Sequence, residues 1–533
     1  MHRRSLLRAG AGLAAGSSLA GLSAPLLAQP ARAATLRFVP QANLTALDPI
    51  WTTAIVTQMH GYHIYDTLYA MDAELRPQPQ MAEGHEVSPD GRVWRIRLRE
   101  GLRFHDGSPV LAKDCAASIA RWAKRDPFGQ IMALAVDEYR APDDRTLEIR
   151  LKRPFPLLLD ALAKPDANVP FILPERLAVT DANTQVSEMM GSGPYRFMRD
   201  EFVSGSRVVY TKFEGYRPRS EAPSGAAGGK IAHYPRIEWH ILPDPATAAA
   251  ALQAGEVDWL DQPLSDLIPT LQRNRNIEVG VLNEAGIMSI MRLNHLQAPF
   301  NNLRTRQAVA LAVDQADYMR STLGEERSIW RECHSLFPCD TPFGTEGLSP
   351  LNTAPRSLDR ARAALQASGY AGEKVVIINP TDFPLIGPHG QVTADRLKRI
   401  GMNVELAETD WGTVVQRRVR TQPVDQGGWS IFHTFGSSLA YLNPAVSSLV
   451  KGPGATGWFG WYDSPRAQGL VDDWLNAPNA ERQLALANEL NKLAQDDVAT
   501  IPLGQFRIRS AWRRSMTGHL KGSMPYPWGV RPV

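Results

Sequence analysis

The chain has 533 residues, enough for about three cores of roughly 150 residues each. Its apolar fraction of 44% and charged fraction of 21% are those of an ordinary soluble globular protein. Removing the signal predicted below (residues 1–33) takes away four arginines and no acidic residue, so the formal net charge of +3 becomes −1. A near-neutral chain gives no reason to expect nucleic acid or an anionic membrane as its partner.

The N-terminal stretch has the pattern of a secretory signal. It has a basic start, an apolar middle and a small-x-small cleavage site at Ala31-Arg32-Ala33. Gly and Ser interrupt the apolar run, and no later segment approaches about eighteen uninterrupted apolar residues, so we expect no membrane span. The sequence therefore predicts a periplasmic protein with a signal peptide at 1–33. Arg3-Arg4 resembles the twin-arginine type, and an ordinary Sec signal is the alternative.

The stretch from Ser88 to Ser118 predicts a strand, two turns and a helix start. Trp94, Ile96 and Leu98 alternate with three arginines, which is typical of a half-buried strand. Gly101 ends the strand, and Asp106-Gly107 predicts a turn. A helix is expected next, with Cys115 on its apolar stripe. This unit by itself indicates no chemistry.

Helices and strands alternate in the second half of the chain. A helix from Asp244 is expected to stop near Gly255, and a helix from Ser357 near Gly369. A strand from Lys374 and a helix–Gly–strand order from Thr393 follow. The first half is richer in strands. This order predicts an α/β fold with a central sheet in the second half.

Three cysteines are present. Cys333 and Cys339 lie close enough to form a disulfide in an oxidising compartment, and two unpaired thiols are the alternative. Cys115 is expected to be packed in the apolar stripe of its helix.

The motifs of common catalytic sites are missing from the sequence. It contains no HExxH, GxSxG or Walker motif, and no GxGxxG after a strand. Gly191-Ser192-Gly193-Pro194 and His105-Asp106 are both expected to form turns rather than catalytic groups. The histidines show no metal-ligand spacing. We therefore expect no enzyme activity, no cofactor and no metal site.

The stretch YDTLYAMDAELRPQPQMAEGHEVSPDGRVWRIRLREGLRFHDGSPVLAKDCAASIARW closely resembles a family signature. The family is the extracytoplasmic solute-binding proteins of ABC importers, of the dipeptide/oligopeptide/nickel type (family 5). His85 departs from the signature, because it stands where the family usually has Trp. The matching positions are Leu68, Ala82-Glu83, Asp90-Gly91, Leu98-Arg99, Gly101, Phe104-His105-Asp106-Gly107, Pro109 and Asp114.

Further stretches extend the resemblance over nearly the whole mature chain; they are Gly191–Tyr195, Phe300–Ala308, Ala312–Asp314, Ala361–Tyr370 and Ile501–Leu503.

The resemblance implies a two-lobed periplasmic-binding-protein clamshell of type II, in the large cluster with an extra subdomain. The expected boundaries are 34–68, 195–292 and 503–533 for the lobe I core, 69–194 for the extra subdomain and 293–502 for lobe II. The FHDG motif is then a mark of the fold with no catalytic role.

The resemblance also implies binding without turnover. A peptide or peptide-like solute enters the cleft, the lobes close, and the protein, expected to be a monomer, docks on an ABC permease served by an ATPase. The alternatives are a non-peptide solute (a sugar, an opine-like conjugate or a metal chelate), and an exported sensor or chaperone. A secreted hydrolase is disfavoured by the missing catalytic motifs.

The amine anchor of peptide-binding relatives is absent here. Such relatives often place an Asp shortly after a Trp in lobe II, to pair with the α-amino group of the peptide. Trp429 matches that Trp, but residues 429–443 contain no carboxylate. A buried ammonium without a counter-charge costs several kcal/mol, which weakens the case for a peptide ligand; Asp382 and Asp410, in neighbouring loops, are the candidates to replace the missing acid.

Aromatic and polar residues predict a pocket that stacks on the solute and hydrogen-bonds it. Trp429 and His433 are the foremost candidates. Core packing is the alternative for Trp411 and Trp429, and is favoured for Trp458 and Trp461. The full set is Trp411, Trp429, His433, Thr434, Phe435, Trp458 and Asp382 in lobe II, with Asn43 and Thr45 in lobe I.

Overall fold

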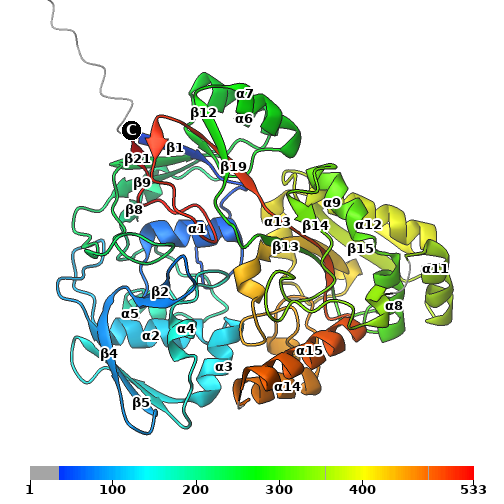
Figure 1. The fold of residues 1–533 in the computed structure, drawn as a ribbon, viewed down its shortest axis with the longest axis horizontal. Helices are drawn as coiled ribbons and strands as arrows, with labels where there is room; N and C mark the ends of the chain where they lie inside the picture. The colour runs from blue at the N-terminus through cyan, green and yellow to red at the C-terminus, as the bar shows by residue number, and fades with distance from the viewer. Residues whose placement is uncertain (1–34, 354–355, 478) are drawn as a thin grey trace, which may run out of the picture.

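The chain folds into two lobes that lie side by side (Figure 1). The computed structural model describes residues 35–353, 356–477 and 479–533, so the predicted signal at 1–33 lies outside the described residues. Lobe I is the part built on a seven-stranded sheet, and lobe II the part built on a six-stranded sheet. This arrangement confirms the predicted two-lobed α/β fold.

The lobe I sheet is mixed, with the order β12-β19-β11-β1-β10-β9-β8. Its central strand, β1, runs parallel to both neighbours, β10 and β11. Leu36 and Phe38 of β1 are buried, as the two-residue period of a strand requires. The strands are β1 (Thr35–Val39), β8 (Tyr195–Phe197), β9 (Arg207–Lys212), β10 (Arg236–His240), β11 (Trp259–Leu260), β12 (Ile277–Val281) and β19 (Arg509–Arg513).

The helix predicted from Asp244 is α6 (Pro245–Ala254). The Asp244 carboxylate accepts a hydrogen bond from the backbone N–H of Thr247, and Gly255 ends the helix with a φ of 76°. Asp244 and Gly255 therefore form the two ends of the helix, as the sequence predicted. The other helical segments of the lobe I core are α1 (Ile55–Ile64), α7 (Ile268–Arg273), η2 (Arg199–Glu201) and η3 (Ser265–Leu267).

The C-terminal tail returns to lobe I. The rings of Tyr526 and Trp528 pack edge-on against Tyr62 of α1, with centroids 5.4 and 5.8 Å away. The tail also contains the short pair β20 (Met516–Thr517) and β21 (Arg531–Pro532). Lobe I is thus completed by the last residues of the chain.

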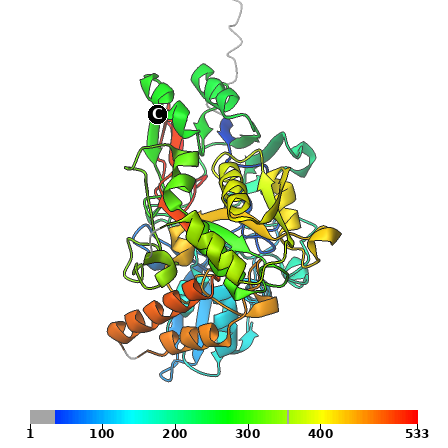
Figure 2. The ribbon, with the colours of Figure 1, turned by 90° about the vertical axis from the view of Figure 1, so that its right-hand side faces the viewer.

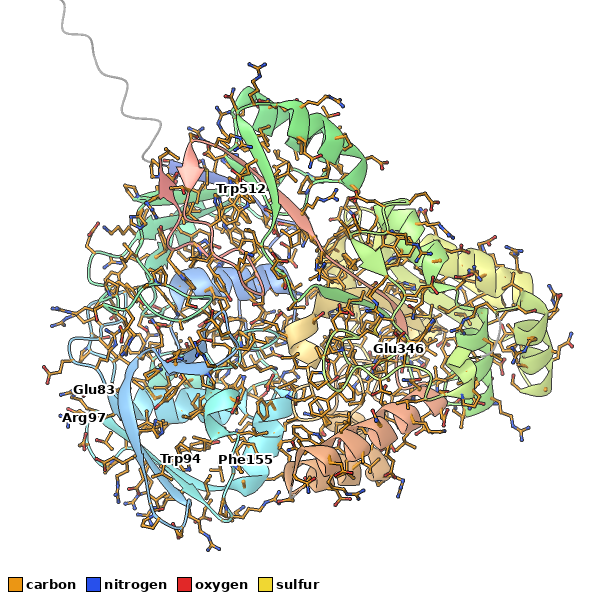
Figure 3. All side chains as sticks on the ribbon, viewed as in Figure 1. Glu83, Trp94, Arg97, Phe155, Glu346 and Trp512 are labelled. Atoms are coloured by element: carbon orange, nitrogen blue, oxygen red, sulfur yellow. A yellow bond between two sulfur atoms is a disulfide. The ribbon has the colours of Figure 1, made fainter. Side chains whose placement is uncertain are left out.

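The extra subdomain is a four-stranded antiparallel sheet covered by helices. In β5, Ile96 and Leu98 are buried while Arg95 and Arg97 are exposed, which confirms the predicted half-buried strand. Figure 3 shows Arg97 beside Glu83 at the outer edge of the sheet, where their side chains pair at 3.3 Å. The elements are β2 (Tyr69–Met71), β3 (Pro77–Pro79), β4 (Ala82–Val87), β5 (Val93–Leu98), β6 (Val136–Arg140), β7 (Thr146–Leu151), α2 (Ala112–Trp122), α3 (Pro127–Ala135), α4 (Leu158–Leu162) and α5 (Glu175–Ala178).

Two of the family-like motifs hold each other in place. The backbone N–H of His105 donates to the carbonyl of Gly191 at 2.9 Å, and His105 Nε2 lies 3.1 Å from the carbonyl of Gly193. A Cβ at Gly191 would lie 1.8 Å from the carbonyl oxygen of Ile64, so only glycine fits there. Burial lowers the pKa of His105 to about 4, which keeps its ring neutral. These contacts are structural, as expected for both motifs.

Lobe II has the sheet order β14-β18-β13-β17-β15-β16. Helices α14 and α15 lie side by side below this sheet, as Figure 1 and Figure 2 both show. The strands are β13 (Ile287–Leu293), β14 (Trp330–Arg331), β15 (Lys374–Pro380), β16 (Asn403–Thr409), β17 (Ile431–Ser437) and β18 (Ile501–Phe506). The helical segments are α8 (Leu303–Ala312), α9 (Gln315–Leu323), α10 (Pro350–Thr353), α11 (Leu358–Ala367), α12 (Gly387–Ile400), α13 (Trp411–Arg417), α14 (Pro465–Leu475), α15 (Ala480–Asp496), η4 (Val424–Gln426), η5 (Ser438–Tyr441) and η6 (Gly454–Thr456).

The chain crosses between the lobes twice, after β12 and after β18. The predicted boundaries at 292/293 and 502/503 fall inside β13 and β18. Every residue of β13 is buried, and the strand pairs with β17 along its whole length. Residues 287–292 and 503–506, which were predicted to belong to lobe I, are therefore part of the lobe II sheet.

The predicted disulfide is present. Cys333 and Cys339 are joined with their Cα atoms 5.9 Å apart. Cys115 is a free, buried thiol in α2, as its place on the apolar stripe predicted.

Candidate functional site

A cavity of about 560 Å³ lies between the two lobes. This volume falls within the range of roughly 300–1,000 Å³ that is usual for small-molecule sites. Lobe I contributes, among others, Gln41, Trp51, Thr53, Lys124, Arg125, Lys164, Asp166 and Asn168. Lobe II contributes, among others, Phe383, Trp411, Arg418, Thr434, Phe435, Tyr441, Lys451 and Trp458.

Hydrogen bonds across the cleft hold the lobes in a closed arrangement. The ammonium of Lys451 in lobe II donates to the carbonyl of Pro127 in lobe I at 3.0 Å. The indole N–H of Trp458 points to the hydroxyl of Thr53 at 3.4 Å. A solute held here touches both lobes, which is the condition for a solute to drive closure.

Thr45 of lobe I lies at the lobe contact and not in the cavity lining. A Cβ on Gly412, at the start of α13, would lie 2.4 Å from the Thr45 methyl carbon. The missing side chain at Gly412 therefore lets the two lobes approach at this point.

Four of the predicted ligand residues line the cavity: Trp411, Thr434, Phe435 and Trp458. The ring of Phe383 packs edge-on against Trp411 and Phe435, with centroids 5.3 and 5.5 Å away. These rings form an apolar wall on the lobe II side, which is suited to stacking on a solute.

The two foremost candidates, Trp429 and His433, lie in the core of lobe II and outside the cavity lining. The indole N–H of Trp429 donates to the carbonyl of Arg418 at 3.1 Å. The His433 ring hydrogen-bonds Thr393 of α12 at 2.8 Å. His433 is therefore buried against α12, while the next two residues of β17, Thr434 and Phe435, line the cavity.

Asn43 and the two alternative acids already have structural partners. The Asn43 side-chain oxygen accepts from the N–H of Gly205 at 3.0 Å. Asp382 accepts from the N–H of Trp411 at 2.7 Å, and Asp410 caps α13. None of the three lines the cavity, so neither acid replaces the missing amine anchor in the closed arrangement.

Arg418 is a residue that the sequence reading missed. It follows the last turn of α13 and is 1% exposed. Among the described residues, its guanidinium hydrogen-bonds only the hydroxyls of Thr52 and Thr53, at 3.3 and 3.5 Å across the cleft, and its Nε has no hydrogen-bond partner. No carboxylate of the described residues lies within 4.0 Å of it. Burial lowers the pKa of Arg418 to about 10.

Asp166 is a second missed residue, on the lobe I side. It is 3% exposed, and its Oδ1 accepts the N–H of Ala167 at 2.7 Å while Oδ2 has no partner. Burial raises the pKa of Asp166 to about 6, against the opposing effects of the Ala167 N–H, the Lys164 ammonium and the Ser437 hydroxyl. The cavity therefore holds a buried carboxylate with a free oxygen.

Two lysines add positive charge to the lining. Lys164 pairs with Asp126, which lies just behind the cavity wall. The ammonium of Lys451 is bound by the carbonyls of Pro127 and Ala445, and burial lowers its pKa to about 7. With Lys124, Arg125 and Arg418, the described part of the lining has five basic side chains and one acidic one, and Lys451 is only partly protonated near pH 7.

Only one of the missed residues left a signal in the sequence. Trp411, Val415 and Arg418 share one face of the α13 turn at spacings of four and three residues, so Arg418 is an arginine on an apolar stripe. Asp166 lies in the irregular stretch AKPDANV, which has no periodicity that predicts burial.

Among the described residues, no helix is long and apolar enough to cross a membrane. Within the same residues, no group of three or more His, Cys, Asp or Glu side chains is placed to hold a metal ion.

Comparison with known proteins places the chain among binding proteins. Residues 76–452 match the family described as bacterial extracellular solute-binding proteins, family 5. A curated relative from Sinorhizobium fredii, named "Probable peptide ABC transporter periplasmic-binding protein y4tO", is 38% identical over 535 residues, covering 100% of this chain and 99% of the relative.

Solved structures share the fold. The binding protein AgaA of A. tumefaciens R10, in complex with agropinic acid, superposes with a TM-score of 0.78 at 18% identity, covering 94% of this chain and 99% of that one. A dipeptide-binding protein of Pseudoalteromonas sp. SM9913, in complex with Met-Leu, gives a TM-score of 0.76 at 17% identity, covering 94% and 100%.

Proposed function

The chain belongs to the bacterial extracellular solute-binding proteins of family 5, and from that premise we propose that it captures a peptide or peptide-like solute and delivers it to an ABC permease. The observation that carries the proposal is the closed cavity of about 560 Å³, whose walls come from both lobes. A solute that contacts both walls shifts the protein toward the closed shape, and the permease then recognises that shape.

We further propose that the protein acts in the periplasm as a monomer, after a signal at 1–33 is removed, and that an ATPase drives the permease. The name of the Sinorhizobium relative, at 38% identity over the full chain, supports the periplasmic site and the peptide class.

Binding without turnover fits the chemistry of the cavity. Among the described residues, the lining of the cavity includes no histidine and no cysteine. The groups present are suited to fixing charges and stacking on apolar surface.

A non-peptide solute such as an opine-like conjugate is the second candidate. The observation in its favour is the absence of a free carboxylate near Trp429, where peptide-binding relatives are expected to hold the α-amine. The surplus of cations in the lining also suits a conjugate with more than one carboxylate.

A thermal-shift screen of residues 34–533 tests the proposal. The panel contains di- to pentapeptides, opine-like amino-acid conjugates, sugars and metal chelates. A ligand of the folded state at one hundred times its Kd stabilises by about 2.7 kcal/mol, so a true solute gives a clear shift. Trp411 and Trp458 lie in the cavity wall, so tryptophan fluorescence should change with the same ligands. Shifts with sugars or chelates alone would overturn the peptide class.

A further inference from the structure

We propose that the cleft selects acidic solutes that have both a carboxylate and a protonated amine, and that it holds the carboxylate on Arg418 and the amine on Asp166. This inference rests on the proposed function, because it names the chemical class of the solute that the same cleft binds. Short acidic peptides and N-substituted acidic amino acids share this chemistry.

Arg418 lacks the partner that its burial demands. A guanidinium offers five N–H donors, and the closed cleft gives this one two long contacts to threonine hydroxyls. The rings of Trp411 and Phe459 lie 5.7 and 4.9 Å from its Cζ, so water has little access. A carboxylate is the group that binds a guanidinium most strongly, through two parallel hydrogen bonds.

Asp166 presents the complementary charge from the other lobe. Its Oδ2 is buried in the lining of the cavity without a hydrogen-bond partner among the described residues, and the Ser437 hydroxyl lies near enough to lower the pKa of Asp166. An ammonium supplies both the donor and the opposite charge.

The backbone holds Asp166 in a fixed position. The next two residues, Ala167 and Asn168, have φ values of 46° and 55°, which is rare for residues other than glycine. The Asn168 side chain donates to the carbonyls of Pro49, Ile50 and Thr52 at 3.1, 2.9 and 3.0 Å, which pins the turn. Strain that is kept at a ligand-facing turn is typical of a functional site.

Tyr441 lies near both anchors. It lines the cavity, and its pKa is raised by burial and by the Asp166 charge, while the charges of Arg292 and Arg418 act against that rise. The phenol therefore lies within the electrostatic field of both anchors.

The rest of the lining favours additional negative charge. The basic side chains Lys124, Arg125, Lys164 and Lys451 share the cavity with one acid. Lys164 is paired with Asp126, and the Lys451 amine, whose pKa is lowered to about 7, has backbone carbonyls as its contacts. A second carboxylate on the solute would meet a positive surrounding, so acidic zwitterions are expected to bind more tightly than neutral ones, and basic ones least.

Isothermal titration of residues 34–533 with matched probes tests the two anchors. The probes are L-Ala-L-Glu, L-Ala-L-Ala and L-Ala-L-Lys, the N-acetyl and C-terminal amide forms of L-Ala-L-Ala, which has a single carboxylate, and N-(1-carboxyethyl)-L-glutamate. For the wild-type protein we expect affinity to fall from Ala-Glu to Ala-Ala to Ala-Lys. Acetylation and amidation should each weaken binding by about 100-fold or more, because each leaves one buried charge unpaired.

Two variants assign each preference to its anchor. Arg418→Met should remove the preference for the free acid over the amide and keep the preference for the free amine. Asp166→Asn should do the reverse. Each preference is a ratio of the affinities of two probes for the same protein. A variant that is partly unfolded binds both probes less, so its ratio does not change. Arg417→Met is the matched control, because Arg417 donates to the carbonyls of Gly427 and Gly428 and lies outside the cavity lining.

The outcomes separate this inference from the proposed function. Dipeptide binding that is unchanged by both acetylation and amidation of Ala-Ala would overturn the two anchors and leave peptide capture intact. Binding of sugars or chelates with none of these probes would overturn the proposed function as well. Tighter binding of the carboxyethyl glutamate than of Ala-Glu would support the two anchors and indicate that the solute is an N-substituted acidic amino acid. The opposite order would indicate an acidic peptide.

Discussion

Two buried arginines of lobe II show the difference between its core and its cleft. Arg292, in β13, donates to the carbonyls of Phe459 and Ala499 at 2.8 and 2.7 Å and to the hydroxyl of Thr500. Arg418 is equally buried but has two long contacts to hydroxyls of the other lobe. The first arginine is satisfied within its own lobe, while the second depends on what enters the cleft.

The buried acids of lobe I differ in the same way. Asp66 is paired with the Lys230 ammonium at 2.7 Å and accepts from the Tyr216 hydroxyl at 2.9 Å. Asp166 has one backbone partner and one free oxygen. Because a buried charge is costly unless it is paired, the core charges stabilise the folded lobes, and the cleft charges favour an open or ligand-filled protein.

The largest expected effect is from breaking the core pair. Lys230→Met leaves the Asp66 charge buried without its ammonium, and we expect the free energy of unfolding to fall by about 3–5 kcal/mol. Urea unfolding at pH 7.5 measures this. A loss below about 1 kcal/mol would mean that this pair is not structural, and would remove the contrast with Asp166.

Arg292→Met should have the next largest effect. It leaves two buried carbonyls without donors, and we expect a loss of about 3 kcal/mol in the free energy of unfolding, with little change in the ratios among solutes. Urea unfolding measures the loss of stability, and isothermal titration measures the ratios of affinity among the solutes. A change in the acid-to-amide ratio would assign Arg292 to the ligand instead of the core.

Asp166→Asn should favour closure of the unliganded protein by roughly 1–3 kcal/mol at pH 7.5, since it removes a buried charge. In the closed form the pKa of Asp166 is raised to about 6, so the closed form binds the proton more tightly than the open form. Closure of the wild-type protein should therefore become easier as the pH falls from about 6 toward 4, and this part of the pH dependence should vanish in the variant. Small-angle scattering across this pH range reports the change as a decrease in the radius of gyration.

Arg418→Met should have the smallest effect on stability. Replacing an unpaired buried guanidinium with an apolar chain of similar length should leave the free energy of unfolding within about 1 kcal/mol of the wild type, or raise it. Thermal unfolding of Arg418→Met and Arg292→Met, both without ligand, compares their stabilities. Equal large losses in both variants would show that Arg418 is as structural as Arg292.

Parts of the site were within reach of the sequence. Trp411, Thr434, Phe435 and Trp458 were predicted from their aromatic and polar side chains, and they line the cavity. Trp429, from the same stretch, packs in the core. Residue type marks a side chain as a candidate for stacking or hydrogen bonding, but it does not say which candidates the tertiary packing leaves at the cleft.

The sequence by itself determined the type of several elements and the pairing of two cysteines, and its resemblance to a known family implied the two-lobed α/β fold. The local features follow from local causes: alternation in β5, the Asp244 cap and Gly255 end of α6, and the short spacing of Cys333 and Cys339. Only the tertiary structure decided which charges are left unpaired. Asp166 and Arg418 are 252 residues apart in the chain and come from different lobes. Whether a buried charge has a partner depends on the whole surrounding packing, and no local pattern encodes that.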